Sequence, residues 1–420
     1  MTLPHLPMRI VPPPLPLLKG GELPLARYLR KNTAQICLYS RFPLLWRRGR
    51  GGGKINKLYI MNSTLYTMNS ELYTPWLPLL QRLIAIPSTS RNEDDAASAL
   101  FDWMTDNGLT PQREKNNVWC CSKDFSDEKP TILLNAHIDT VKPVSSWTRN
   151  PFESAIDDSG RLYGLGSNDC GGGLVALLQT FIALNATQQA YNIIFLATAE
   201  EEVSGADGMQ LMQSMLPEIA LAIVGEPTGM QPAIAEKGLM VVDVTCRGVA
   251  GHAARREGVN AIYEAIDDLQ WLRTYRFKKE STLLGATLMQ VTMIEAGTAH
   301  NVVPDTCRMV VDVRTNELYT NSEVLDIIQR NLKGEAVARS LRLSSSRISI
   351  EHPFVKRCVA LGKTPFGSPT LSDQALLTCH SVKMGPGDSS RSHTADEYIM
   401  LAEVDDAINT YIKLLDGLQL

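Results

Sequence analysis

The chain has 420 residues, more than one compact core usually takes, so we expect at least two domains. Hydrophobic residues make up 44% and charged residues 20%, and the net charge of −4 argues against nucleic acid as the main partner. No apolar run approaches the ~18 residues that a membrane-spanning helix needs, so we expect no membrane partner.

Residues 1–60 differ in composition from everything that follows. They hold 11 Lys and Arg residues and one acidic residue, Glu22, whereas the rest of the chain is acidic. They contain three consecutive prolines and a basic, glycine-rich stretch, and their apolar residues follow no period. We therefore expect a basic extension that is either disordered or not native to the protein. The second alternative arises because Met61 and Met68 each precede a stretch that looks like the ordinary start of a protein.

Beyond residue 75 the chain alternates between helical and strand patterns. Amphipathic helices are predicted over 76–86 and 94–108. Short apolar runs that end in polar or acidic residues follow at 131–137, 192–202, 220–229 and 381–390. Because such runs between helices are typical of buried parallel strands, we expect an α/β domain with a mainly parallel sheet flanked by helices. Sites in such sheets form beyond the carboxyl ends of the strands, so acids and a histidine should gather along one edge.

Residues 231–350 indicate a different unit. The pattern predicts strands at 233–248, 285–296, 305–314 and 340–350, with helices at 258–273 and 322–332. This β-α-β-β-α-β order is the α+β ferredoxin-like motif. Because a strand of the earlier kind returns at 381, we expect this unit to be inserted into a discontinuous domain of residues 69–230 and 351–420.

The eight cysteines of the chain are scattered. They form no CxxC pair and no regular framework. This usage favours a reduced, cytoplasmic compartment.

His137 and Asp139 end the first of the apolar runs. On a strand they share a face, because alternate residues do. A carboxylate in this position could hold the second nitrogen of a metal-bound imidazole. The pair alone is a weak signal, and a surface histidine is an equal alternative.

Asp169 lies in a glycine-rich turn, where the backbone can approach a ligand closely. The stretch is not a dinucleotide-binding fingerprint, because Asp169 stands in the place of its third glycine. Cys170 could be a nucleophile. However, no histidine lies nearby in the sequence, so a small buried thiol is favoured.

Further acids follow two other apolar runs: the triplet that ends at Glu202, and Glu226. An acidic triplet at an exposed helix start would be ordinary. Here, together with Asp139 and Asp169, at least five carboxylates would converge, repel one another and be costly to desolvate. Bound divalent cations would resolve this repulsion, so the cluster predicts a metal centre. Of the histidines, His393 follows the last run and could contribute, although a structural role is the alternative.

These residues occur in a pattern that resembles the M20 metallohydrolases, and among them acetylornithine deacetylase and related N-acyl-amino-acid deacylases. The matching stretches stand in the family's order at 137–141, 147–152, 160–169, 199–202, 225–228, 248–254, 299–305 and 385–398. One departure is the Cys170-Gly171-Gly172 triplet, where relatives commonly have Met-Lys-Gly. That departure removes no implied ligand and changes the residues that surround the site.

The resemblance implies two divalent metal ions, Zn²⁺ in the first place and Co²⁺ or Mn²⁺ as alternatives. His137 and Glu226 would be terminal ligands of one ion. Glu202 and His393 would hold the second, and Asp169 would bridge both.

The resemblance also implies roles for five further residues. Glu201 would be the general base, and Asp139 would orient the metal-bound histidine. His252, in the inserted unit, would reach the site of a neighbouring subunit, although a structural histidine is the alternative. Asn301 and Arg314 would bind the α-carboxylate of the substrate.

The implied protein is a homodimer, joined through an inserted unit that serves as lid and dimerisation domain. Its implied reaction is cleavage of the amide bond of a small N-acyl amino acid, foremost N-acetylornithine-type deacetylation in arginine biosynthesis. N-succinyl-amino-acid desuccinylation and dipeptide cleavage are alternatives. A catalytically silent binding protein of the same fold is a further alternative. Glu201 argues against this alternative, because a site that only bound metal would not need a general base.

Overall fold

The computed structural model describes residues 37–38, 57–61, 64–67, 75–255 and 257–420. By its internal contacts the chain divides into two units, residues 1–74 and 75–420. In the first unit the described residues form a three-stranded sheet of β1 (Cys37–Leu38), β2 (Lys57–Met61) and β3 (Thr64–Thr67). Most of the basic extension predicted at residues 1–60 lies outside the described residues.

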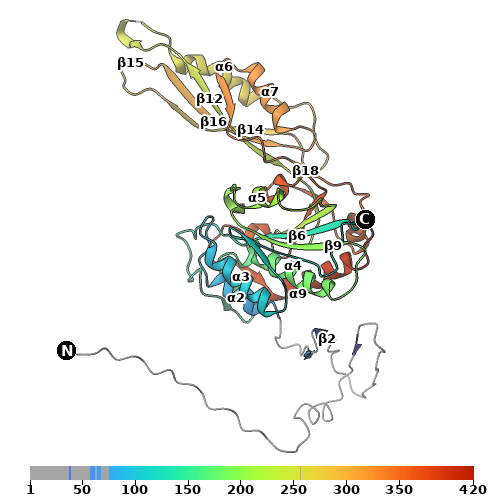
Figure 1. Ribbon diagram of the computed structural model, residues 1–420. Helices are drawn as coiled ribbons and strands as arrows, with labels where there is room; N and C mark the ends of the chain where they lie inside the picture. Colours follow the sequence, from blue (N-terminus) through green and yellow to red (C-terminus); the bar gives the residue numbers. More distant parts are fainter. Residues whose placement is uncertain (1–36, 39–56, 62–63, 68–74, 256) are drawn as a thin grey trace, which may run out of the picture. The chain divides into compact units, whose positions relative to one another are not determined.

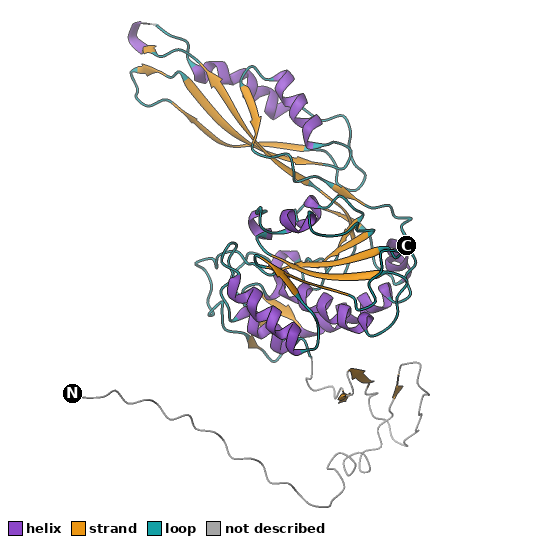
Figure 2. Cartoon of the chain, in the orientation of Figure 1, coloured by secondary structure: helices purple, strands orange, loops and turns teal. Residues whose placement is uncertain are grey.

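The second unit contains a nine-stranded sheet (Figures 1 and 2). Its strand order is β18-β11-β20-β10-β6-β9-β5-β4, and β19 pairs with β11. The strands are β4 (Gln112–Glu114), β5 (Asn117–Cys121), β6 (Thr131–His137), β9 (Asn192–Thr198), β10 (Leu221–Val224), β11 (Ala233–Glu236), β18 (Ser346–Arg347), β19 (Phe366–Ser368) and β20 (Ser381–Lys383).

This sheet is mixed, whereas the sequence predicted a mainly parallel one. The four central strands, β20, β10, β6 and β9, run parallel. On one side β5 and β4 are antiparallel, and on the other β11 is antiparallel to β20 and β18. The turn between β4 and β5 is too short for a crossover, so these two strands can pair only as a hairpin. The prediction therefore holds for the centre of the sheet and for the pairing of β19 with β11, but not for the remaining outer strands.

Helices cover both faces of the sheet, so all seven residues of β6 are buried. Ile132 and Leu134 pack into one core, and Leu133 packs into the other, because successive side chains of a strand point to opposite faces. Figure 1 shows α2, α3, α4 and α9 on one face and α5 on the other. The helices are α2 (Leu77–Ile84), α3 (Asp94–Asp106), α4 (Gly172–Asn185), α5 (Met209–Gln213), α8 (Pro353–Ala360) and α9 (Leu401–Leu415).

Residues 238–338 form a separate antiparallel sheet with the strand order β14-β16-β12-β17. Its elements in chain order are β12 (Gly238–Arg247), α6 (Ala261–Thr274), β14 (Leu288–Ala296), β16 (Thr306–Thr315), α7 (Asn321–Asn331) and β17 (Glu335–Ala338). Alternate residues of β12, beginning with Met240 and Val242, are buried in a core of their own. We refer to residues 238–338 as the small module.

Two strands predicted near the ends of this module differ in the structure. The strand predicted at 233–248 is divided at Lys237: β11 belongs to the large sheet and β12 to the small module. Of the strand predicted at 340–350 only β18 forms, and it pairs with β11 in the large sheet, whereas β17 is the last strand of the module. Local periodicity cannot show which sheet a strand joins, since long-range pairing decides it.

No helix in the described part of the chain combines the length and the apolar character needed to cross a membrane. The cysteines whose side chains are described are all free, and most of them are buried.

Candidate metal centre

The carboxyl ends of three neighbouring parallel strands supply the middle of the site. His137 is the last residue of β6, and Glu226 lies two residues beyond β10. Glu201 and Glu202 lie in a short turn, η2 (Glu201–Val203), that follows β9. Since parallel neighbours end at the same edge of a sheet, residues distant in sequence meet here.

Two loops complete the cluster. Asp169 lies in η1 (Ser167–Gly171), the turn before α4, and His393 lies in the loop after β20. The Oδ1 atom of Asp169 is 3.3 Å from Nε2 of His137, and its Oδ2 atom is 3.6 Å from Nε2 of His393. Asp169 thus stands between the two histidines, with one carboxylate oxygen towards each.

A further carboxylate accompanies each histidine. Oε1 of Glu226 lies 3.6 Å from Nε2 of His137. Oε2 of Glu202 lies 2.9 Å from Nε2 of His393. The cluster therefore has two halves that share Asp169.

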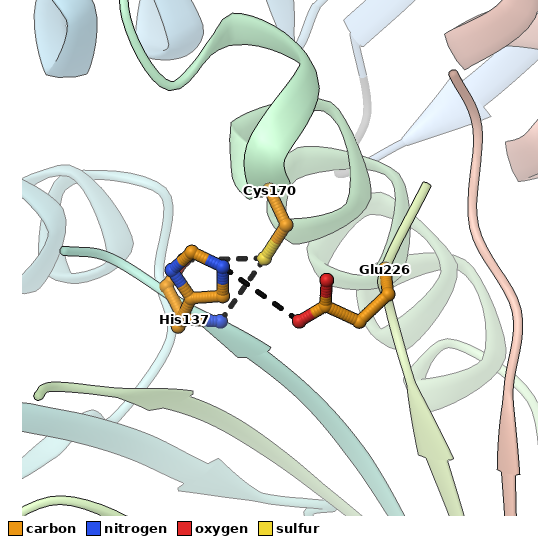
Figure 3. A group of neighbouring side chains, drawn as sticks. All are labelled: His137, Cys170 and Glu226. Atoms are coloured by element: carbon orange, nitrogen blue, oxygen red, sulfur yellow. Dashed lines mark hydrogen bonds and ion pairs between the residues drawn. The ribbon is translucent and has the colours of Figure 1, made fainter. Parts of the chain in front are cut away.

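The chemistry of these groups fits divalent cations. Two sets of ligand atoms each lie within 4.8 Å of one another. One set comes from His137, Cys170 and Glu226 (Figure 3), and the other comes from His137, Asp169 and Glu202. Oε1 of Glu226 is buried and has no hydrogen-bond partner among the described residues, which is costly for a carboxylate oxygen without a cation. Imidazole nitrogens and carboxylate oxygens are ligands of Zn²⁺ and related ions.

The pKa values of these groups in the protein alone also indicate a site that requires bound cations. Burial, followed by repulsion from Asp169, raises the pKa of Glu226 to about 8. Burial, together with repulsion from Glu226, raises the pKa of Glu201 well above its usual value despite the attraction of His137. The hydrogen bond to Glu202 raises the pKa of His393 to about 9. Without a cation the site therefore retains protons that a bound metal ion would displace.

The Asp139 carboxylate links the end of β6 by hydrogen bonds to the turn that contains Glu201 and Glu202. It accepts hydrogen bonds from the backbone N–H groups of Glu201 and Glu202, at 3.1 and 3.2 Å, and from the Ser90 hydroxyl at 2.7 Å. Nδ1 of His137 is 2.9 Å from the backbone oxygen of Asp139 but 3.6 Å from its carboxylate. The main chain of Asp139 therefore contacts the imidazole more closely than its side chain does.

Glu397 is a buried residue that sequence reasoning did not single out. Its carboxylate accepts hydrogen bonds from the backbone N–H groups of Gly166, Asn168 and Asp169, at 3.0, 2.8 and 2.9 Å. Burial raises the pKa of Glu397 to about 8. It lies four residues beyond His393, so it joins the two loops that flank the cluster. Its only sequence signal is its place in the matching stretch 385–398.

A cavity of about 400 Å³ opens beside the acids. Glu201, Glu202 and Glu226 line one part of it, and Phe366 and residues 368–371 line another. Lys383 also contributes to the wall, held by a buried ion pair of 2.8 Å with Glu236. The cavity has room for a small substrate next to the candidate ligands.

His252 and Asn301 lie elsewhere in the chain. His252 is exposed in β13 (Gly251–His252), which pairs with β15 (Val302–Val303), and exposed Asn301 directly precedes β15. Figure 1 shows β15 at the end of the small module that points away from β6 and β9. Within one chain the structure does not bring these two residues to the strand-end acids.

Arg314 lies on β16 of the same module and is partly exposed. Its guanidinium pairs with the Asp312 carboxylate, with an Nε–Oδ1 distance of 2.9 Å. It does not line the cavity beside the acids either.

An α/β sheet whose strand ends gather two histidines and several carboxylates is the architecture of metal-dependent peptidases and deacylases. The chain belongs to the family described as Peptidase family M20/M25/M40, whose profile matches residues 133–417.

Similar proteins support this assignment. The chain is 27% identical over 361 residues to acetylornithine deacetylase of Shigella sonnei (strain Ss046), covering 77% of this chain and 93% of that protein. Aminopeptidase PepT from Bacillus cereus shares the fold with a TM-score of 0.65 and 18% identity, over 81% of this chain and 97% of that one. The Bacillus subtilis YXEP protein, described as a dinuclear metal-binding M20 peptidase, matches with a TM-score of 0.63 and 18% identity, over 82% of this chain and 98% of that one.

Proposed function

We propose that this chain is a two-metal hydrolase that cleaves the amide bond of a small N-acyl amino acid, with N-acetylornithine-type deacetylation in arginine biosynthesis as the favoured reaction. The observation that carries the proposal is the position of Asp169 between His137 and His393. The similarity to acetylornithine deacetylase supports the acyl-amino-acid substrate, and the dinuclear YXEP protein supports two ions.

In this proposal His137 and Glu226 would hold one ion, Glu202 and His393 would hold the other, and Asp169 would contribute to both sites. Zn²⁺ suits this mixture of imidazole and carboxylate, with Co²⁺ or Mn²⁺ as alternatives. When bound, such ions polarise the amide carbonyl and make a water molecule more acidic.

Glu201 transfers a proton from the attacking water to the leaving amine. Its side chain lines the cavity next to the ligands, and no hydrogen bond reaches its carboxylate from the described residues. Glu201 accepts a proton from the attacking water as the new C–O bond forms, and then donates it to the amine nitrogen as the C–N bond breaks. The hydrogen bond from the Glu201 backbone to Asp139 holds the base in place.

We infer that His252 acts on the site of a second copy of the chain. The small module has an edge strand, β14, and a helix, α6, that expose apolar side chains: Ile262, Tyr263, Ile266, Leu288, Met293 and Ile294. An exposed strand edge beside apolar side chains is suited to pairing with a second copy. A homodimer formed through this lid would let His252 stabilise the oxyanion in its partner's site, with Asn301 beside it. Arg314 would bind the substrate carboxylate after giving up its ion pair with Asp312.

The test is a panel of substrates with released amine as the readout. It compares N-acetylornithine, N-acetylcitrulline and N-acetyllysine with their N-succinyl counterparts and with dipeptides. We expect N-acetylornithine to react fastest, chelation to abolish the reaction, and Zn²⁺ or Co²⁺ to restore it. Faster dipeptide cleavage would favour the peptidase alternative, which the fold shared with PepT supports. A metal-loaded protein that hydrolyses none of these compounds would favour the binding-protein alternative.

A further inference from the structure

Cys170 converges with two proposed metal ligands. Figure 3 shows the side chains of His137, Cys170 and Glu226 pointing towards one another from three different elements. Each offers one ligand atom, and these atoms lie within 4.8 Å of one another. Cys170 is 1% exposed and directly follows the proposed bridging residue, Asp169, in η1. Among the described residues it is the only cysteine grouped with other ligand-type side chains in this way.

The distances are compatible with a shared ion. Two atoms bound to one tetrahedral Zn²⁺ at about 2.0 Å (nitrogen or oxygen) and about 2.3 Å (sulfur) lie ~3.5 Å apart. Atoms at the outer limit of 4.8 Å would need to approach by ~1.3 Å. A change of χ1 at Cys170 can supply a movement of this size.

One of the two hydrogen bonds of the sulfur suits a metal-bound thiolate. The backbone N–H of His137 donates to Sγ of Cys170 at 3.2 Å, and the thiol in turn donates to the backbone oxygen of His137 at 3.5 Å. A metal-bound thiolate keeps the first bond, which stabilises its negative charge, and gives up the second together with its proton. On the other side of the group, Oε1 of Glu226 is buried and accepts no hydrogen bond from the described residues. Both atoms can therefore serve a cation without losing a strong hydrogen bond.

We propose that Cys170 supplies a sulfur ligand to the ion held by His137 and Glu226. This inference rests on the proposed two-metal function. The thiol proton leaves to solvent as the metal–sulfur bond forms, and no oxidation state changes. The two ions then occupy chemically unequal sites, because the half formed by Glu202 and His393 has no sulfur. A thiolate favours Zn²⁺ and Cd²⁺ over Mn²⁺ and Mg²⁺, so the sulfur site should discriminate between these ions.

The test is the absorption spectrum of the full chain loaded with Co²⁺. A cobalt–thiolate bond gives an intense near-ultraviolet charge-transfer band, whereas nitrogen and oxygen ligands give only weak visible bands. We expect the intense band in the wild type and its loss in Cys170→Ser, with the visible bands retained. The matched control is Cys358→Ser, which alters a fully buried cysteine on α8 that belongs to neither ligand group and should keep the band.

Two further measurements do not depend on activity. Zn²⁺ affinity of Cys170→Ser should fall at least about tenfold relative to Mn²⁺ affinity, because even indirect partners of a metal site contribute that much. If the variant does not fold, zinc-edge X-ray absorption of the wild type should still show a sulfur neighbour at about 2.3 Å. Visible bands without the charge-transfer band, and no sulfur neighbour, would overturn the proposal while leaving the two-metal function intact. A wild-type chain that binds no Co²⁺ or Zn²⁺ would overturn both.

Discussion

Glu201 and Glu202 are adjacent in the sequence but have different surroundings. Both line the cavity, but the Glu202 carboxylate contacts His393, whereas no hydrogen bond reaches the Glu201 carboxylate from the described residues. Their backbone N–H groups share one acceptor, Asp139. This arrangement separates a candidate ligand from a candidate base within a single turn.

We expect Glu201→Gln to keep its metal and to lose about 10²–10⁴-fold in kcat, because a general base contributes on this order. Glu202→Ala is the companion variant and should lower the bound metal, since it removes a ligand. Metal content by elemental analysis and kcat on the best substrate are measured for both. A loss under tenfold in Glu201→Gln would contradict its role as base. Loss of metal from that variant alone would mean that the two roles are exchanged.

The buried carboxyls also predict how stability depends on pH. In the metal-free protein Glu226 and Glu397 have pKa values of about 8, so between their unfolded values and pH 8 the folded state binds more protons than the unfolded state. We expect stability to fall as pH rises through this window, by on the order of several kcal/mol. His393, with a pKa of about 9, acts in the same direction because its stabilisation is lost as pH rises towards that value.

Thermal unfolding of chelated protein between pH 5 and pH 8 measures this effect. We expect Tm to decrease across the range, and the decrease to be smaller in Zn²⁺-loaded protein, where a cation replaces the protons. A metal-free Tm that is constant or rises with pH would show that these carboxyls are not held protonated.

At the scale of elements, the start of α4 must approach β10 closely to hold η1 in place. A Cβ atom at Gly173 would collide with the backbone oxygen of Gly225, which directly follows β10. A Cβ atom at Gly172 would meet mainly the end of the Ile399 side chain, which can move more easily. The two glycines are neighbours on one helix but differ in what surrounds them.

We therefore expect Gly173→Ala to destabilise the protein by more than ~2 kcal/mol, the range for an overpacked core, and to lower metal affinity by displacing the Asp169 turn. Gly172→Ala is the matched control and should cost less. Chemical unfolding and Zn²⁺ titration measure the two effects. Equal losses in both variants would show that the contact between α4 and β10 does not limit the site.

At the scale of the whole molecule, the division at residues 74 and 75 separates the N-terminal unit from the part that contains the entire candidate site. A chain that starts at Met68 should therefore fold and hydrolyse substrate within about twofold of the full chain, since it keeps the second unit complete. A chain that starts at Met61 is the companion. Soluble yield and kcat/KM measure the outcome, and loss of either would show that the first unit supports the second.

The proposed action of His252 on the site of a second copy predicts complementation between chains. Mixing His252→Ala with Glu201→Ala chains should restore about a quarter of wild-type activity, because random exchange makes half of the dimers hybrids with one intact site each. Each variant alone should be nearly inactive, and subunit exchange is verified with differently tagged chains. Mixtures that exchange subunits but stay inactive would mean that His252 acts within its own chain or has only a structural role.

The sequence by itself determined the local elements and the chemical character of the site. The predicted strand at 131–137 is confirmed as β6, and the predicted helices at 76–86 and 94–108 correspond to α2 and α3. Apolar periodicity reports these elements because burial acts on neighbouring residues of one segment. The order of residues along the chain likewise predicted that acidic residues follow several strands.

Only the tertiary structure decided which distant groups share a site. It places Glu397 under the Asp169 turn, sets Cys170 beside Glu226, and divides the strand at Lys237 between two sheets. None of these relations has a local signature, because each depends on pairing between segments far apart in the chain. The sequence shows which residues can bind a cation, and the fold determines which of their ligand atoms lie close together.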